Sequence, residues 1–283
     1  DRPRPGVRKI ILSTNIAETS ITIEDVVYVI DCGKSKEKSY DALNDMACLS
    51  PNWISRASAQ QRRGRAGRVR PGFCVRIYTR QKFAKMKTHA LPEMLRTPLE
   101  ELVLSVKSLK LGTARDFVAQ AINPPPPKAV INAVELLCAI GAIRKENESL
   151  TALGTHLINL PVTPRVGKML IVACALGCVE PALTVAAATA TRDPFVLPMD
   201  KKQEADLSRR EFSRKTHSDH VAIAVAFHEW QYVKNMRGNG AARTFAKHRF
   251  LSHETMERMV TTRKQFAGLL EAAGFKVGGS GIG

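Results

Sequence analysis

The nine residues QQRRGRAGR, 60–68, combine four arginines with two glycines and one apolar side chain. If this stretch is helical, Gln61, Arg65 and Arg68 share one face, because they lie four and three residues apart. Arginine suits phosphate, since its planar guanidinium stays charged and donates two parallel hydrogen bonds. The glycines are poor helix formers, which are tolerated best where something approaches the backbone closely. Composition alone favours a solvated basic face, whereas the spacing suggests an anion site.

The charge of the whole chain points the same way. The 283 residues carry a formal charge of +17, with a pI of about 9.9. Residues 1–90 hold 18 Lys and Arg against 8 Asp and Glu, residues 91–200 are balanced, and residues 201–283 hold 15 against 8. Basic ends favour polyanions, nucleic acid above all. A generic basic protein would have the same balance, so charge alone decides little.

Short apolar runs predict the elements that must position the arginines. Residues 9–14, 26–31 and 73–78 are typical of buried parallel strands. Residues 33–50 predict a β-hairpin with a turn at DALND, and residues 55–68 predict a helix. Strands that alternate with a helix indicate an α/β sheet.

The pattern changes near Thr97, after which helices dominate. Pro98 lies at a predicted helix start and Gly112 at its end, and NPPPP leads into a helix that runs to about Ile140. Residues 142–154 predict a small β-wing, and the chain is helical from Pro164 almost to the end. These elements indicate a winged-helix unit followed by an all-α unit.

Two motifs resemble those of one enzyme family. QRRGRAGR resembles motif VI of superfamily 2 helicases, and STNIAETSITI, from Ser13 to Ile23, resembles motif V of the DEAH/RNA helicase A type. PLEELVLSVKSLKLG, NPPPPKAVINAVELL and SLTALGTHLINLPVTPRVGKML resemble the winged-helix and ratchet domains that follow the second RecA-like domain there. The resemblance implies a partial RecA-like domain at 1–95, a winged helix at 96–160, a ratchet domain at 161–275 and a flexible tail at 276–283.

The resemblance also implies roles for individual residues at the boundary between two RecA-like domains. Gln61 would position the γ-phosphate and the attacking water, and Arg65 and Arg68 would act as arginine fingers. Glu24, where many relatives carry Asp, would bind the nucleotide. The residues implied to contact nucleic acid are Thr14, Asn15, Lys34, Lys36, Lys38 and Arg62. The three lysines alternate along a predicted strand and so share one face, which fits either RNA contact or a strand kept soluble.

The function implied is that of an ATP-dependent RNA helicase, which couples ATP hydrolysis to movement on single-stranded RNA and to unwinding. Neither GxxxxGK[ST] nor DExH occurs in the sequence. Both belong to the first RecA-like domain, which would hold Mg²⁺ and most of the ATP, so the chain is interpreted as a fragment that alone does not hydrolyse ATP. The expected partners are that domain and RNA, single-stranded or structured, with DNA left open. The alternative is a non-catalytic winged-helix nucleic-acid-binding or scaffold protein with degenerate helicase motifs.

Other candidate sites are weaker. The six cysteines form no CxxC pair, which indicates reduced thiols, an intracellular protein of nucleus or cytoplasm, and no zinc site. His217 and His220 could begin a metal site, but a helix N-cap at Ser218 is the simpler interpretation. Trp53 and Trp230 could stack on bases, although packing is the safer interpretation. No apolar run is long enough to span a membrane.

Overall fold

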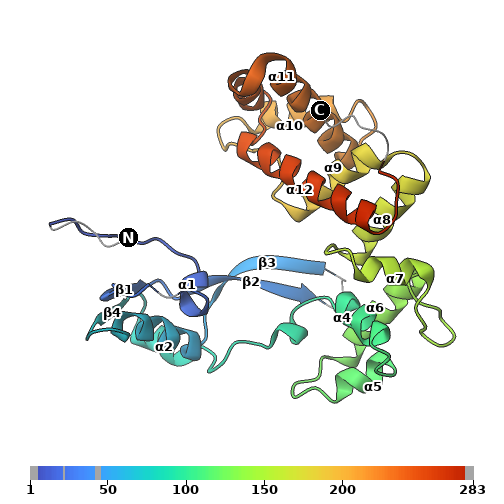
Figure 1. Cartoon of the computed structure of the whole chain (residues 1–283). Helices are drawn as coiled ribbons and strands as arrows, with labels where there is room; N and C mark the ends of the chain where they lie inside the picture. The colour runs from blue at the N-terminus through green and yellow to red at the C-terminus, as the bar shows by residue number, and fades with distance from the viewer. Residues whose placement is uncertain (1–5, 22, 42–45, 278–283) are drawn as a thin grey trace. The chain divides into compact units, whose positions relative to one another are not determined.

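The structure, a computed structural model, describes residues 6–21, 23–41 and 46–277 (Figure 1). Packing divides the chain into two compact units. The first unit comprises residues 1–99 with 114–133, and the second comprises residues 100–113 with 134–283. The predicted turn at 42–45 and the predicted tail beyond residue 277 lie outside the described residues. The expected domain boundaries at residues 95 and 160 stay predictions.

The first unit contains the arginine-rich stretch at residues 60–68 and the strand-forming segments. Its elements are α1 (Ile16–Thr19), β1 (Tyr28–Asp31), β2 (Lys34–Asp41), β3 (Met46–Trp53), α2 (Arg56–Gly64), the 3-10 turn η1 (Arg65–Gly67), β4 (Phe73–Arg76), α3 (Arg80–Lys85), the 3-10 turn η2 (Glu93–Leu95) and α5 (Ala114–Ala119).

β1 and β4 form a parallel pair, in register from Tyr28 opposite Phe73 to Asp31 opposite Arg76. Alternation along each strand sends successive side chains to opposite faces of the pair. One face, which includes the buried Asp31, packs against α2 and η1. The other face exposes apolar side chains, among them Tyr28 stacked on Phe73 with ring centroids 5.6 Å apart.

The strand expected at residues 9–14 is wrong. The described residues there have no regular secondary structure, and Ile10 and Leu12 are 79% and 94% exposed. An extended segment becomes a strand only when a neighbour satisfies its N–H and C=O groups. Among the described residues, β1 and β4 pair only with each other, so the apolar run has no partner strand.

The predicted β-hairpin is confirmed. β2 and β3 pair antiparallel, in register from Lys34 opposite Trp53 to Asp41 opposite Met46. The hairpin is inserted between β1 and α2, and it leaves β1 through Gly33, whose φ of 70° suits glycine. This connection places the first residues of the hairpin beside the helix that carries motif VI.

The helix predicted at residues 55–68 is present but shorter. Ser55 caps it by accepting a hydrogen bond from the Ser58 N–H at 3.0 Å. The α-helix ends at Gly64, and the chain tightens into η1 from Arg65 onward. The glycines explain this change, since each weakens an α-helix by about 1 kcal/mol relative to alanine.

The second unit is helical. Its elements are α4 (Glu100–Ser108), the end of α6 (Pro127–Ala139), α7 (Ala152–Ile158), α8 (Pro164–Ala175), α9 (Val179–Ala190), α10 (Lys202–Phe212), α11 (Asp219–His248, interrupted at Gly238) and α12 (His253–Ala272).

The core of the second unit surrounds α9, whose residues 182–188 are all buried. One cluster centres on Trp230 and Phe212, and another on Leu183 and Leu270. Trp230 is fully buried, so packing, and not base stacking, is its role here. The predicted wing is reduced to a single antiparallel bridge between Ile143 and Leu150.

Candidate active site

Gln61, Arg65 and Arg68 line one hollow in the first unit, of about 310 Å³. Gly64 and the α1 residues Glu18 and Thr19 complete its wall. The sequence spacing predicted the shared face of the three long side chains, and the structure brings them together at the junction of α2 and η1. A polar hollow with arginine forks suits an anion such as phosphate.

Arg65 connects this hollow to α1. Its Nε donates to the carbonyl oxygen of Glu18 at 2.7 Å, and its Nη1 donates to the carbonyl oxygen of Ile21 at 3.2 Å. Its Nη2 also donates to the Glu18 carbonyl oxygen. The guanidinium is therefore oriented by main-chain oxygens, which carry only partial negative charge. Arg68 and Gln61 are exposed at the same hollow.

Arg62 faces away from the hollow and enters a cluster of charges. It donates from Nε to Glu18 Oε2 and from Nη1 to Asp31 Oδ1, each at 3.0 Å. Its side chain is 13% exposed. Burial opposes its charge, but the hydrogen bonds and charges of Glu18 and Asp31 outweigh burial and raise its pKa. An RNA contact would have to displace part of this pairing, and the RNA role of Arg62 stays a prediction.

Sequence reasoning missed the carboxylate of Asp31 and the hydroxyl of Tyr78. Tyr78 donates to Asp31 Oδ2 at 2.9 Å. Burial and this hydrogen bond raise the pKa of Tyr78 to about 12. The two residues lie 47 positions apart, so no local spacing connects them. Only the alternation of β1, which points Asp31 towards α2, hinted at its burial.

The remaining predicted ligands lie on the surface around α1. Thr14 and Asn15 are exposed just before the helix, and Thr14 Oγ1 accepts a hydrogen bond from the Ile16 N–H at 3.4 Å. Glu24 is exposed and does not line the hollow. Their contacts with RNA and nucleotide stay predictions.

The hairpin lysines lie on β2. Lys34 and Lys36 are exposed, and Lys38 occupies the same strand opposite Leu49. The Lys34 ammonium lies 3.9 Å from the centre of the Trp53 ring. Lys82 lies 4.4 Å from the same centre. Trp53 is therefore a cation–π partner at the root of the hairpin.

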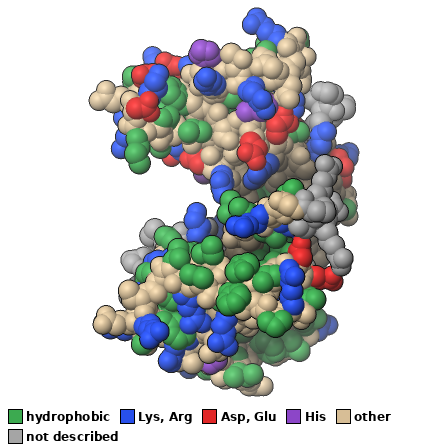
Figure 2. All heavy atoms as spheres, turned by 90° about the vertical axis from the view of Figure 1, so that its left-hand side faces the viewer, with side chains coloured by type: hydrophobic (Ala, Val, Ile, Leu, Met, Phe, Trp, Pro, Cys, Tyr) green, Lys and Arg blue, Asp and Glu red, His purple; other side chains and the backbone are tan. Residues whose placement is uncertain are grey.

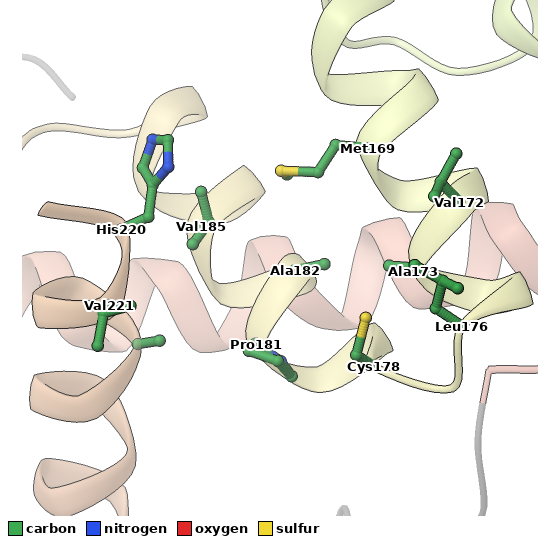
Figure 3. A pocket seen from close by; sticks show the side chains of 11 residues that line it. Met169, Val172, Ala173, Leu176, Cys178, Pro181, Ala182, Val185, His220 and Val221 are labelled. Carbon is green, nitrogen blue, oxygen red and sulfur yellow. The ribbon is translucent and has the colours of Figure 1, made fainter. Parts of the chain in front are cut away.

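A second hollow, of about 340 Å³, lies in the second unit (Figure 3). Side chains of α8, α9 and α11 line it, and nearly all are apolar, as Met169, Val185 and Val221 illustrate. Its one titratable ring, His220, has no acidic partner in the lining. Such a wall cannot orient a charged reactant, so the smaller, polar hollow is the candidate active site.

The proposed N-cap at Ser218 is confirmed, since its side chain accepts a hydrogen bond from the Val221 N–H at 3.3 Å. Across the described ranges no group of three or more His, Cys, Asp or Glu side chains could hold a metal ion. No helix among those same residues is long and apolar enough to cross a membrane.

Comparisons with known proteins identify the class. A helicase conserved C-terminal domain matches residues 1–70, a winged-helix helicase-associated domain matches residues 133–162, and a ratchet-like helicase-associated domain matches residues 163–223. The first match contains the hollow and both motifs. The fold is thus a partial RecA-like domain followed by winged-helix and ratchet domains, as expected.

The three matches show that the chain carries the C-terminal part of a helicase core, and its relatives are DExH-box helicases of superfamily 2. It is 53% identical to the DExH-box ATP-dependent RNA helicase DExH1 of Arabidopsis thaliana, over 97% of this chain and 27% of that protein. It is 44% identical to the human ATP-dependent DNA/RNA helicase DHX36, over 97% of this chain and 27% of that protein. It is 43% identical to the human ATP-dependent RNA helicase DHX29, over 96% of this chain and 20% of that protein.

The chain therefore spans about a quarter of the length of these relatives. All three are named as ATP-dependent helicases, and none supports the alternative of a non-catalytic scaffold.

Proposed function

We propose that this chain is part of an ATP-dependent RNA helicase and supplies the arginine side of its ATP site. The observation that carries the proposal is the grouping of Gln61, Arg65 and Arg68 around one polar hollow. Three side chains that can donate to phosphate oxygens, beside a motif V helix, match what hydrolysis of a nucleotide γ-phosphate requires.

The residues suggest a division of labour. Gln61 would orient the attacking water through its side-chain amide. Arg65 and Arg68 would stabilise the negative charge that develops on the γ-phosphate oxygens. Arg65 must exchange its main-chain partners, Glu18 on α1 and Ile21 just beyond it, for phosphate, and charge-assisted hydrogen bonds to phosphate are the stronger ones. Nucleotide binding would in this way break hydrogen bonds between Arg65 and motif V.

Mg²⁺ would neutralise charge on the phosphates, as in other nucleotide hydrolases. The donor set of this hollow fits phosphate better than metal, since its one carboxylate, Glu18, is already paired with Arg62. We therefore assign Mg²⁺ to a domain that bears the P-loop and the DExH motif. Glu24 is proposed to contact the nucleotide outside the hollow.

RNA binding is proposed for the surface that carries Thr14, Asn15, Lys34, Lys36 and Lys38. Its affinity would come mostly from phosphate contacts, with little preference for sequence. DNA, with the same backbone charge, remains a second partner to test. In the lower part of Figure 2, Lys and Arg side chains are spread over the face of the first unit that is turned to the viewer. Hydrophobic side chains lie between them.

The test is steady-state ATP hydrolysis with and without RNA, on the full-length protein and on this chain alone. We expect RNA-stimulated turnover and strand separation from the full-length protein and no turnover from the chain. RNA-stimulated turnover by the isolated chain would refute the division of the site. Its absence from the full-length protein would favour the non-catalytic alternative.

A further inference from the structure

Asp31 lies at a point where four segments of the first unit meet. Its side chain is fully buried. Oδ1 accepts hydrogen bonds from the Gly33 N–H at 2.9 Å and from Arg62 Nη1 at 3.0 Å, and Oδ2 accepts one from the Tyr78 hydroxyl at 2.9 Å. A buried carboxylate is tolerated when it is paired and hydrogen-bonded in this way. One side chain therefore ties the end of β1 to the turn into β2, to α2 and to the segment after β4.

Arg62 extends the connection in two directions. Beyond Asp31 it donates to the carbonyl oxygen of Lys34, the first residue of β2, at 3.2 Å. It also forms an ion pair with Glu18 of α1 at 3.0 Å. Because Arg62 is adjacent to Gln61 in α2, any displacement of the catalytic face of α2 moves Arg62 with it.

The root of the hairpin, at Gly33, is both closely packed and hydrogen-bonded. A Cβ added to Gly33 would lie 2.7 Å from the Tyr78 ring and 3.1 Å from Trp53. The Gly33 carbonyl oxygen accepts a hydrogen bond from the Ile54 N–H at 3.1 Å, where β3 leads into α2. β2 begins and β3 ends beside Gly33, whose N–H donates to Asp31, so the root of the hairpin is connected to α2 through Asp31 and Arg62.

We propose that Asp31 is a positioning residue that transmits displacement of α2 to the β2–β3 hairpin. The inference rests on the proposed function, in which Gln61, Arg65 and Arg68 respond to ATP. Asp31 does not line the hollow. Because the hairpin carries three lysines of the proposed RNA surface, a change at Asp31 should alter the coupling between hydrolysis and strand separation, and not hydrolysis itself.

The decisive variant is Asp31→Asn in the full-length protein. The amide keeps the size of the side chain but removes the charge that pairs with Arg62. We expect the number of duplexes separated per ATP hydrolysed to fall about tenfold, a change of the size found for residues that couple two sites. RNA-stimulated hydrolysis should stay within about threefold of wild type, which is less than 1 kcal/mol of lost transition-state stabilisation.

Two further variants guard against misfolding and non-specific effects. Tyr78→Phe removes one hydrogen bond to Asp31 and leaves its charge, so it should lower coupling less than Asp31→Asn. Asp25→Asn is the matched control, because Asp25 pairs with Lys9 at 3.3 Å on the surface of the same unit. It should change neither hydrolysis nor coupling.

A second readout needs no enzyme activity. In the 283-residue chain, Asp31→Asn should accelerate hydrogen exchange at the Ile54 amide and at amides of α2 together, while Asp25→Asn should not. Equal losses of hydrolysis and strand separation, or unchanged exchange at both places, would overturn the positioning role. Absence of RNA-stimulated hydrolysis in the wild-type protein would instead overturn the proposed function, and exchange would then decide the inference alone.

Discussion

The Nε of Arg65 donates a hydrogen bond of 2.7 Å to the main-chain carbonyl oxygen of Glu18, which joins motif VI to the helix of motif V. The side chain of the same Glu18 pairs with Arg62. Neighbouring arginines thus hold one residue of α1 by its backbone and by its carboxylate. If Arg65 released Glu18 to bind phosphate, the ion pair between Arg62 and Glu18 would still be in place. α1 could then move when the hollow is occupied without separating from α2.

Removal of either proposed arginine finger should abolish hydrolysis but not nucleotide binding. In the full-length protein, Arg65→Ala or Arg68→Ala is expected to lower the hydrolysis rate by about 10³-fold or more, the range seen for arginine fingers. Binding of a fluorescent ATP analogue should change little, because a P-loop domain would hold most of the nucleotide. Arg63→Ala is the control, since Arg63 is exposed and does not line the hollow. Hydrolysis near the wild-type rate in Arg65→Ala would remove this assignment.

Replacing Gly64 with alanine should raise the stability of the chain while slowing hydrolysis. No atom lies within 4 Å of a Cβ added there, so Gly64→Ala should raise the free energy of unfolding by up to about 1 kcal/mol. The new methyl group would nevertheless stand at the wall of the hollow. We expect a slower full-length enzyme with a more stable chain, measured by hydrolysis and by urea unfolding. An enzyme of wild-type rate would show that phosphate does not approach the backbone at Gly64.

Replacing Gly72 with alanine should instead destabilise the chain. A Cβ added there would lie 2.0 Å from the carbonyl oxygen of Ala66 and 2.5 Å from that of Val27, and backbone atoms cannot move aside as a flexible side chain can. Gly72→Ala should therefore lower the free energy of unfolding by about 1–3 kcal/mol or more, through overpacking. Urea unfolding of the chain measures the loss, and an unchanged midpoint would contradict the packing of η1 against β1.

The hairpin lysines should set the salt dependence of RNA binding. Each phosphate contact on a single strand contributes about 0.7 to the slope of log affinity against log salt. The double variant Lys34→Ala and Lys36→Ala should lower that slope by about 1.4, if both contact phosphate. Lys201→Ala with Lys202→Ala, which removes two exposed lysines near the start of α10, is the matched control. Equal slopes for the two double variants would make β2 merely a soluble strand.

Tyr78 should make the first unit sensitive to alkaline pH. Its pKa is raised from 10.0 to about 12 by burial and by its hydrogen bond to Asp31. The unfolded chain therefore releases this proton at lower pH than the folded chain does. The stabilisation is complete below pH 10 and is lost between pH 10 and 12. Unfolding curves across this range should decline less steeply for Tyr78→Phe than for wild type, and parallel declines would contradict the hydrogen bond.

Sequence patterns were sufficient where the determinants are local. The spacing of Gln61, Arg65 and Arg68 predicted their shared face, and the hairpin and Ser218 cap followed from turn and cap residues. The apolar run at 9–14 misled, because a strand depends on a partner that the pattern does not contain. The change to a 3-10 turn at Arg65 was not predicted, although Gly64 and Gly67, which weaken the α-helix there, are visible in the sequence.

The cluster around Asp31 was beyond prediction for a different physical reason. Its members, Glu18, Asp31, Arg62 and Tyr78, come from four separate segments. Opposite charges and hydroxyls occur throughout the sequence, so only the folded chain selects which of them meet. Apart from the alternation of β1, the local sign that could have drawn attention to this turn is an Asp at the end of a strand, two residues before Gly33.

The exposed face of the β1–β4 pair has a practical consequence. Tyr28, Ile30, Phe73 and Val75 are each more than half exposed there. Within the described part of the chain both strands also keep one edge without a partner. Unpaired edges beside apolar side chains are templates for aggregation. Purified alone, the chain should associate with itself as its concentration rises, and co-expression with a polypeptide that covers this face would be the way to keep it in solution.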